Sequence, residues 1–473
     1  MAGSKLYEQV ADRLARQIEQ GLYQPGDRLP GVRRLARQFG VSISTVVQAQ
    51  RWLEDDGLIE ARPRSGWYVR ARAWPRPEPP AISRPVVRPV PVTGQELVLR
   101  LVQAANEPDF VQLGAAVPAP EFLPARAMQR ALAAAARSGG GELASYRFPP
   151  GSGDLRRQIA RRMADAGCQV SPEEIVITSG CQEALILALR AVTAPGDVVA
   201  IESPSFYGLL QAIDSLGLKA LEIPTDPASG ISLEALELAL EKWPVRSCVL
   251  SANFSNPLGC VMPLAKKRAL VDLLARHGIP LIEDDIYGEL GFEGERPPAL
   301  RAFDETAGVI HCASFSKTLS PGLRVGWIVP GRWQAQVEYL KYVTSLAAPT
   351  LSQRAVADFL RHGGYDRYLR QVRGTYARQV ALMSRAVSRA FPEGTRITRP
   401  RGGFVIWVEL PETVDALALC QRLLAQRISI APGPVFSASG KYRHFIRLNC
   451  ARPWNDILER AVNTVGRLAH AMV

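Results

Sequence analysis

The residue of this chain best suited to covalent chemistry is Lys317, in the run Ala-Ser-Phe-Ser-Lys-Thr at residues 313–318. Its primary amine can form a Schiff base with an aldehyde cofactor. The chain has 8 Lys and 49 Arg, so lysine is the rarer of its two cations. A lysine among small hydroxyl residues after the apolar pair Val309-Ile310 therefore does not fit an ordinary surface position. A single Ser-x-x-Lys run is weak evidence, and a solvated loop lysine is the alternative. Other segments must supply the groups that bind a cofactor.

Five short apolar runs alternate with helical patterns in the middle of the chain. They lie at residues 175–178, 198–201, 248–250, 279–282 and 308–311. Such an alternation predicts a buried, mostly parallel sheet. Ligands bind such sheets outside the carboxyl ends of the strands. We therefore expect functional side chains directly after the runs.

The segments after these runs carry candidate groups for a phosphorylated ring. Gly180 and Cys181 open a helix whose free N–H groups suit a phosphate, although such turns are common. Asp284 is the middle one of three consecutive acids, which would be costly to bury without partners. Phe206 can stack on a flat ring or belong to the core. Asn256, before a proline, can be a turn residue.

Together these groups match the needs of pyridoxal phosphate. That cofactor requires a lysine, a carboxylate on its pyridine nitrogen, hydrogen bonds to its phenolate and donors for its phosphate. Lys317 and Asp284 supply the first two, and Asn256 and Tyr287 are the phenolate partners. The candidate phosphate donors are Gly180, Cys181, Ser314, Ser316 and Arg324. The sequence therefore predicts a pyridoxal phosphate site, and we expect no metal site.

On these motifs, residues 95–473 resemble a class I aminotransferase of pyridoxal phosphate fold type I. The spacing of Asp284, Tyr287 and Lys317 resembles the aminoadipate and aromatic branch of that family. The resemblance implies an α/β domain with a large, mostly parallel sheet part at about 140–340. A smaller C-terminal α+β part would occupy about 345–473.

The resemblance also implies roles for individual residues. Lys317 would carry the cofactor as an aldimine, Phe206 would stack on its ring, and Gln182 would join the phosphate ligands. Tyr146, in Tyr-Arg-Phe-Pro-Pro-Gly, matches a tyrosine that such enzymes lend across a homodimer. Arg447, in Phe-Ile-Arg-Leu-Asn, matches the arginine that grips a substrate α-carboxylate through a bidentate pair.

Residues 1–70 have the pattern of a small DNA-binding domain. Leu6, Val10, Leu14 and Ile18 recur at four-residue spacing and predict a first helix. We expect a second helix at about 32–39, a third at about 42–55 capped by Ser42, and two short strands at 58–62 and 67–70. Two helices joined by a turn and followed by a hairpin predict a winged helix-turn-helix, whose second helix enters the major groove. A small helical interaction module is the alternative.

Three motifs favour the DNA-binding interpretation. They are Gln-Pro-Gly-Asp-Arg-Leu-Pro at 24–30, Val-Ser-x-x-Thr-Val at 41–46 and Arg-Pro-x-Ser-Gly at 62–66. They resemble the GntR-type DNA-binding domain. The resemblance implies contacts with double-stranded DNA from Arg33 or Arg34, Ser42, Ser44, Thr45 and the wing residue Arg64.

Residues 71–93 contain seven prolines and predict an extended, semi-rigid linker. The predicted domains are therefore 1–70 and 94–473. Composition is that of an ordinary globular protein, with 47% hydrophobic and 22% charged residues. The net charge of +12 permits nucleic-acid binding without demanding it. No signal peptide, membrane span or paired cysteine motif is apparent, so we expect a cytoplasmic protein with reduced thiols.

A GntR-type reader joined to an aminotransferase-like domain resembles the MocR group of bacterial transcriptional regulators. That resemblance implies a sensor, in which an amino compound or the cofactor itself changes the state of Lys317 and so the affinity for an operator. A working transaminase with an autoregulatory DNA-binding domain is the main alternative. A binding-only module with a dead cofactor site agrees poorly with the complete set of residues.

Overall fold

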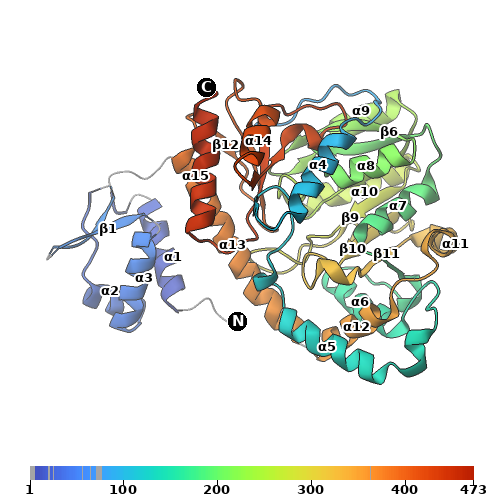
Figure 1. Ribbon diagram of the computed structural model, residues 1–473, viewed down its shortest axis with the longest axis horizontal. Helices are drawn as coiled ribbons and strands as arrows, with labels where there is room; N and C mark the ends of the chain where they lie inside the picture. Colours follow the sequence, from blue (N-terminus) through green and yellow to red (C-terminus); the bar gives the residue numbers. More distant parts are fainter. Residues whose placement is uncertain are drawn as a thin grey trace. The chain divides into compact units, whose positions relative to one another are not determined.

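The computed structural model describes residues 6–19, 22–24, 26–55, 57–63, 65–70, 77–362 and 364–473. The chain divides into two compact units, Met1–Arg76 and Pro77–Val473 (Figure 1). The boundary falls inside the predicted linker. No helix in the described ranges is long and apolar enough to span a bilayer.

The first unit is the three-helix domain with a hairpin that the sequence predicts. Its elements are α1 (Leu6–Glu19), α2 (Val32–Phe39), α3 (Ile43–Asp55), β1 (Ile59–Arg62) and β2 (Gly66–Val69). Leu14, Leu35, Val46 and Leu53 are fully buried and form its core. Gly40 ends α2 with a φ of 66°, a left-handed conformation that glycine adopts without steric cost.

An eight-stranded sheet forms the centre of the second unit (Figure 1). In spatial order its strands are β4 (Val176–Thr178), β11 (Gly326–Val329), β10 (Val309–Ser314), β9 (Leu281–Asp284), β8 (Val245–Leu250), β5 (Val198–Ser203), β6 (Lys219–Asp226) and β7 (Gly230–Ile231). The strands from β10 to β6 run parallel, whereas β11 and β7 are antiparallel to their neighbours. The predicted, mostly parallel sheet is confirmed.

Helices cover both faces of this sheet. The helices of this part of the unit are α5 (Ala125–Ser138), α6 (Gly153–Asp165), α7 (Cys181–Val192), α8 (Tyr207–Ser215), α9 (Leu233–Lys242), α10 (Leu264–Arg276), α11 (Gln334–Ser345) and α12 (Thr350–His362). Val199 and Ile201 of β5 pack with α7 and α8. Val198 and Ala200 pack with α9 and α10 on the opposite face. Burial on both faces explains why the strand runs are continuously apolar.

A smaller part contains a four-stranded antiparallel sheet. Its strands are β12 (Arg396–Ile397), β13 (Val405–Glu409), β16 (Phe445–Asn449) and β15 (Ala431–Pro432), and its helices are α13 (Tyr365–Ala390), α14 (Ala416–Leu424) and α15 (Asp456–His470). Helix α4 (Gln95–Asn106) and the parallel pair β3 (Val111–Gln112) and β14 (Ile428–Ser429) complete the unit. This arrangement agrees with the predicted α+β part.

Residues 77–93, which the sequence assigns to the linker, belong to the second unit. Val90 pairs with Ala220 of β6 in an antiparallel bridge. Val92 is 3% exposed and joins the core beside α7. Proline keeps the segment extended, and an extended segment can lie along a strand as readily as it can span solvent.

Candidate cofactor site and DNA-binding surface

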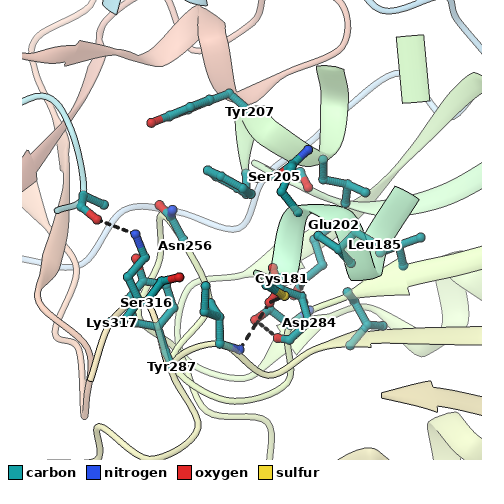
Figure 2. Close-up of a pocket in the computed structure, with 18 of the residues that line it drawn as sticks. Cys181, Leu185, Glu202, Ser205, Tyr207, Asn256, Asp284, Tyr287, Ser316 and Lys317 are labelled. Carbon is teal, nitrogen blue, oxygen red and sulfur yellow. Dashed lines mark hydrogen bonds between the residues drawn. The ribbon is translucent and has the colours of Figure 1, made fainter. Parts of the chain in front are cut away.

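A cavity of about 200 Å³ lies at the carboxyl ends of the parallel strands (Figure 2). The segments after β5, β8, β9 and β10 contribute to its wall, as expected for such a sheet. Nine of the predicted residues line it: Cys181, Gln182, Phe206, Asn256, Asp284, Tyr287, Ser316, Lys317 and Arg324. Gly180, Ser314, Arg447 and Tyr146 lie outside this wall in the single chain.

Asp284 ends β9, and its carboxylate faces Cys181 at the start of α7 (Figure 2). Its Oδ1 accepts hydrogen bonds from Cys181 Sγ at 3.4 Å and from the N–H of Ile286 at 3.2 Å. Burial raises the pKa of Asp284 to about 6. Both hydrogen-bond partners are uncharged, and a buried carboxylate is stabilised most by a cationic donor. Asp284 therefore fits a protonated pyridine nitrogen.

Tyr287 and Asn256 present unused donors to the cavity. The Tyr287 side chain is 2% exposed, and its hydroxyl has no hydrogen-bond partner in the described ranges. Burial raises the pKa of Tyr287 above its usual value, so the hydroxyl keeps its proton. Asn256 Oδ1 accepts from Arg447 Nη1 at 3.0 Å, which leaves the Asn256 Nδ2 group as a donor. The pair fits a phenolate oxygen.

Lys317 follows β10, and its Nζ donates to the Ala116 carbonyl at 2.8 Å (Figure 2). Burial, together with the positive charge of Arg447, lowers the pKa of Lys317 to about 8. A lowered pKa provides more neutral amine at physiological pH, and the neutral amine is the form that attacks an aldehyde. The electrostatics therefore suit covalent attachment of a cofactor.

The start of α7 and the residues after β10 form a site suited to a phosphate. Gly180 has a φ of 92°, and a side chain there would collide with the Arg324 guanidinium. Arg324 Nη2 donates to the Ser179 carbonyl at 2.7 Å, which holds this cation beside the helix N-terminus. The Ser314 hydroxyl accepts from the Ser316 N–H at 3.3 Å. Helix dipole, free N–H groups and cation all favour an anion.

Two aromatic rings and one acid complete the cavity wall. Phe206 lines the cavity with its ring centroid 4.8 Å from that of Tyr207. Tyr207 and Glu202 also line the cavity, and the sequence interpretation missed both. Glu202 Oε2 accepts from the Ser251 N–H at 2.9 Å, and burial raises the pKa of Glu202 to about 7. The signal that could have identified Glu202 is its place directly after the apolar run at 198–201.

Arg447 lies behind the cavity wall. It is fully buried, and beyond Asn256 its Nη2 donates to the Gly114 carbonyl. Its guanidinium lies 5.0 Å from the Phe436 ring centroid. Tyr146 is 70% exposed and stacks on Phe148 at 5.6 Å. The single chain does not bring Tyr146 to its own cavity, so its role across a dimer stays a prediction.

The predicted DNA-contacting residues of the first unit lie on α2 and at the start of α3. The Ser42 Oγ accepts from the Thr45 N–H at 3.2 Å and lies 2.8 Å from Ser44 Oγ. Arg33 and Arg34 are exposed on α2, and Ser42 and Ser44 are exposed at the start of α3. Arg64, the predicted wing contact, falls outside the described residues. The hydroxyl groups and the helix N-terminus suit phosphate oxygens.

Comparison with known proteins agrees with both halves of this description. Residues 110–465 match the family model of aminotransferase class I and II. Residues 6–69 match that of the bacterial regulatory proteins of the gntR family. The two units thus define a fusion of a helix-turn-helix reader with an aminotransferase-type domain.

Two relatives match most of the chain. The chain is 44% identical to the uncharacterized HTH-type transcriptional regulator YjiR of Escherichia coli K12, over 98% of both chains. It is 33% identical to the 2-aminoadipate transaminase of Thermus thermophilus, over 78% of this chain and 92% of that protein. This chain belongs to the GntR-type regulators with an aminotransferase class I and II domain, the architecture of the MocR group.

A solved structure supports the cofactor. The aminoadipate aminotransferase LysN from Thermus thermophilus, complexed with N-(5'-phosphopyridoxyl)-L-leucine, superposes with a TM-score of 0.74 at 32% identity. The match covers 81% of this chain and 96% of that one. Together with the fit of Asp284, Tyr287 and Lys317, it identifies pyridoxal phosphate as the cofactor of this domain.

Proposed function

We propose that this protein is a DNA-binding transcriptional regulator whose second unit binds pyridoxal phosphate and an amino compound. Occupancy of the cavity then changes the affinity of the first unit for operator DNA. The observation that carries this proposal is the presence, in one chain, of a helix-turn-helix unit and a cavity lined by a half-buried lysine, Lys317. Such a protein acts where the chromosome is, in the cytoplasm.

Each cavity residue has a role in this proposal. Asp284 pairs with the ring nitrogen, Asn256 Nδ2 and the Tyr287 hydroxyl donate to the phenolic oxygen, and the Phe206 ring packs on the heterocycle. The phosphate ligands are the start of α7 at residues 180–182, together with Ser314, Ser316 and Arg324. When bound, pyridoxal phosphate supplies an aldehyde and an electron-withdrawing ring. Lys317 is the attachment point and the proton carrier at Nζ.

The amino compound binds between the cofactor and Arg447. Its carboxylate would displace the Gly114 carbonyl from Arg447 Nη2 and pair with the guanidinium. We further propose a homodimer in which Tyr146 of one chain completes the cavity of the other. The exposure of Tyr146 and its stacking on Phe148 leave its ring available to a second copy.

Borohydride reduction followed by peptide mass spectrometry tests the cofactor site. The pyridoxyl mass should appear on the peptide that contains Lys317 and should be absent from Lys317→Ala protein. A mass on another lysine, or on none, would refute the assignment. Operator binding, measured by fluorescence anisotropy with and without cofactor and amino acids, tests the regulatory role. Equal DNA affinity under all these conditions would refute it.

A working transaminase is the second candidate function. The complete set of cavity residues and the 33% identity to a 2-aminoadipate transaminase favour it. Steady turnover of an amino donor and a keto acid, at the roughly 1–10³ s⁻¹ typical of enzymes, would establish it. Turnover slower than this, together with ligand-dependent DNA binding, would support the regulator.

A further inference from the structure

Residues 77–93, here called the strap, are anchored on both parts of the second unit. Glu78 accepts a hydrogen bond through its carbonyl from the Ile397 N–H at 2.9 Å, at the edge of the smaller sheet. Ser83 pairs with Thr225 of the large sheet, by the Ser83 N–H to the Thr225 carbonyl at 3.1 Å and by the Thr225 N–H to Ser83 Oγ at 2.8 Å. The strap therefore bridges the two sheets.

The strap stays on the large sheet beyond Ser83. Val90 and Ala220 exchange two backbone hydrogen bonds of 2.9 Å, and Val87 packs against the core under α9 and α10. In Figure 1 the blue trace of this segment passes beside β6 and α9. The large part thus holds most of the strap, and the smaller part holds its first residues.

A short stretch of chain separates the two anchors. Glu78 and Ser83 are five residues apart, so the chain between them spans at most about 18 Å when fully extended. Pro79 and Pro80 stiffen this stretch further. A shift of the smaller part relative to the large part therefore displaces Pro77, the first residue after the boundary with the DNA-binding unit.

The far end of the strap is connected to the cavity wall. The Ser205 N–H, in the wall, donates to the Phe436 carbonyl at 2.9 Å, and the Tyr207 and Phe436 ring centroids are 5.7 Å apart. Two residues further along, the Ala438 carbonyl accepts from the Thr93 N–H and hydroxyl, each at 3.1 Å. A change at Ser205 or Tyr207 can thus reach the strap through Phe436 and Ala438.

A buried carboxylate fixes this connection. Glu222 of β6 is 2% exposed, and its oxygens accept from Ser203 Oγ at 2.9 Å and Ser437 Oγ at 3.1 Å. The Tyr442 hydroxyl lies 2.6 Å from Ser203 Oγ. Because β5, β6 and the 437–442 segment share these bonds, the segment moves with the cavity wall rather than independently of it.

We propose that the strap transmits the state of the cavity to the DNA-binding unit. This inference rests on the proposed function and assigns the route of its regulation. A ligand that favours one arrangement of the two parts changes the path of residues 77–83, and the linked unit is repositioned as a result.

Hydrogen–deuterium exchange of the full chain, with and without pyridoxal phosphate, tests the route. Amides of Ser83, Val90 and Ile397 should exchange at least about threefold more slowly, or faster, when the cofactor binds. The exposed turn at 293–295 should not change. Protection of cavity peptides with an unchanged strap overturns the inference alone. No change even in the peptide containing Lys317 refutes the cofactor site, and the inference with it.

Lengthening the strap is the second test. Inserting Gly-Ser-Gly-Ser between Pro77 and Glu78, on the DNA-binding side of the first anchor, should leave cofactor attachment intact. The ratio of DNA affinities with and without pyridoxal phosphate, for a duplex selected by the natural protein, should fall to within about twofold of one, from the roughly 5–150-fold typical of coupled sites.

The same insertion after Gly294, an exposed glycine where an added side chain would meet no other atom, is the matched control and should keep the natural ratio. A Pro77–Glu78 insertion that also keeps the natural ratio overturns the inference. A natural protein with a ratio of one refutes the regulatory function and this route together.

Discussion

The two units of this protein hold their functional groups in opposite physical settings. In the first unit, Arg34, Ser42 and Ser44 lie exposed on a small helical scaffold. In the second, Asp284 and Lys317 lie in a cavity where burial displaces their pKa values. Exposed groups act through charge and are weakened by salt, whereas buried groups act through desolvation and specific partners. The comparison predicts that substitutions in the cavity have large, pH-dependent effects on cofactor binding. Substitutions in the DNA-binding unit should have smaller, salt-dependent effects on DNA binding.

Removing the charge of Asp284 should have the largest effect. Asp284→Asn replaces a charge-assisted hydrogen bond to the ring nitrogen, worth about 1.5–3 kcal/mol, so cofactor affinity should fall roughly 10- to 150-fold. Equilibrium titration with pyridoxal phosphate measures this affinity. The exposed Asp272→Asn is the control and should bind normally. Unchanged affinity in Asp284→Asn would remove this residue from the site.

Gly180→Ala, compared with Gly196→Ala, distinguishes two causes of weaker cofactor binding: backbone strain and displacement of Arg324 from the phosphate site. Gly180 and Gly196 have φ values of 92° and 93°, so alanine at either position should cost about 1–3 kcal/mol of unfolding free energy. Only at position 180 would the added methyl group collide with Arg324. At position 196 it would meet no other atom. Cofactor affinity should therefore fall about 5- to 30-fold in Gly180→Ala alone, the equivalent of about 1–2 kcal/mol. An equal loss in Gly196→Ala would show that strain, rather than displacement of Arg324, is responsible.

The rate of cofactor attachment should follow the titration of Lys317. With a pKa of about 8, about one amine in ten is neutral at pH 7 and about nine in ten at pH 9, so the rate should rise about tenfold over that range and then level. Arg447 lowers this pKa, so Arg447→Met should move the midpoint to higher pH. Stopped-flow kinetics across pH measures both. An unmoved midpoint, as expected for the exposed control Arg332→Met, would contradict the electrostatic role of Arg447.

The smallest predicted effect concerns the DNA-binding unit. If Arg34 contacts a phosphate, Arg34→Ala should reduce the slope of log affinity against log salt by about 0.9, which is roughly a 3.5-fold difference between about 50 and 200 mM salt. Anisotropy titrations at several salt concentrations measure the slope. Arg276→Ala, on the second unit, should leave it unchanged. An unaltered slope in Arg34→Ala would place that side chain away from DNA.

The sequence predicted the two architectures because their patterns are local. Apolar runs followed by polar groups placed Asp284 and Lys317 at strand ends, and turn and cap residues such as Gly40 and Ser42 set the helices of the reader. The contact between Lys317 and the Ala116 carbonyl could not be predicted, because a backbone oxygen 201 residues away carries no side-chain signal.

Residues 77–93 of the predicted linker show a second limit of prediction from the sequence. Prolines at 77–91 predict an extended chain correctly, but extension does not say whether that chain lies in solvent or along β6. The contacts of Ser83 and Val90 are made by backbone atoms and one hydroxyl, and these depend on the tertiary fold. Tyr207 was missed for a related reason, since two adjacent aromatic residues give no indication of which one faces a cavity.

The hydrogen bond between Arg447 Nη1 and Asn256 Oδ1 has an optical consequence. In the proposed binding mode, the Nδ2 group of the Asn256 side chain would donate to the phenolic oxygen of a chromophore. A ligand carboxylate that pairs with the Arg447 guanidinium would weaken its hydrogen bond to Asn256. The electron density of the bound chromophore would change as a result. The hue of the protein would then register the arrival of its effector, and a spectrophotometer would suffice to search for it.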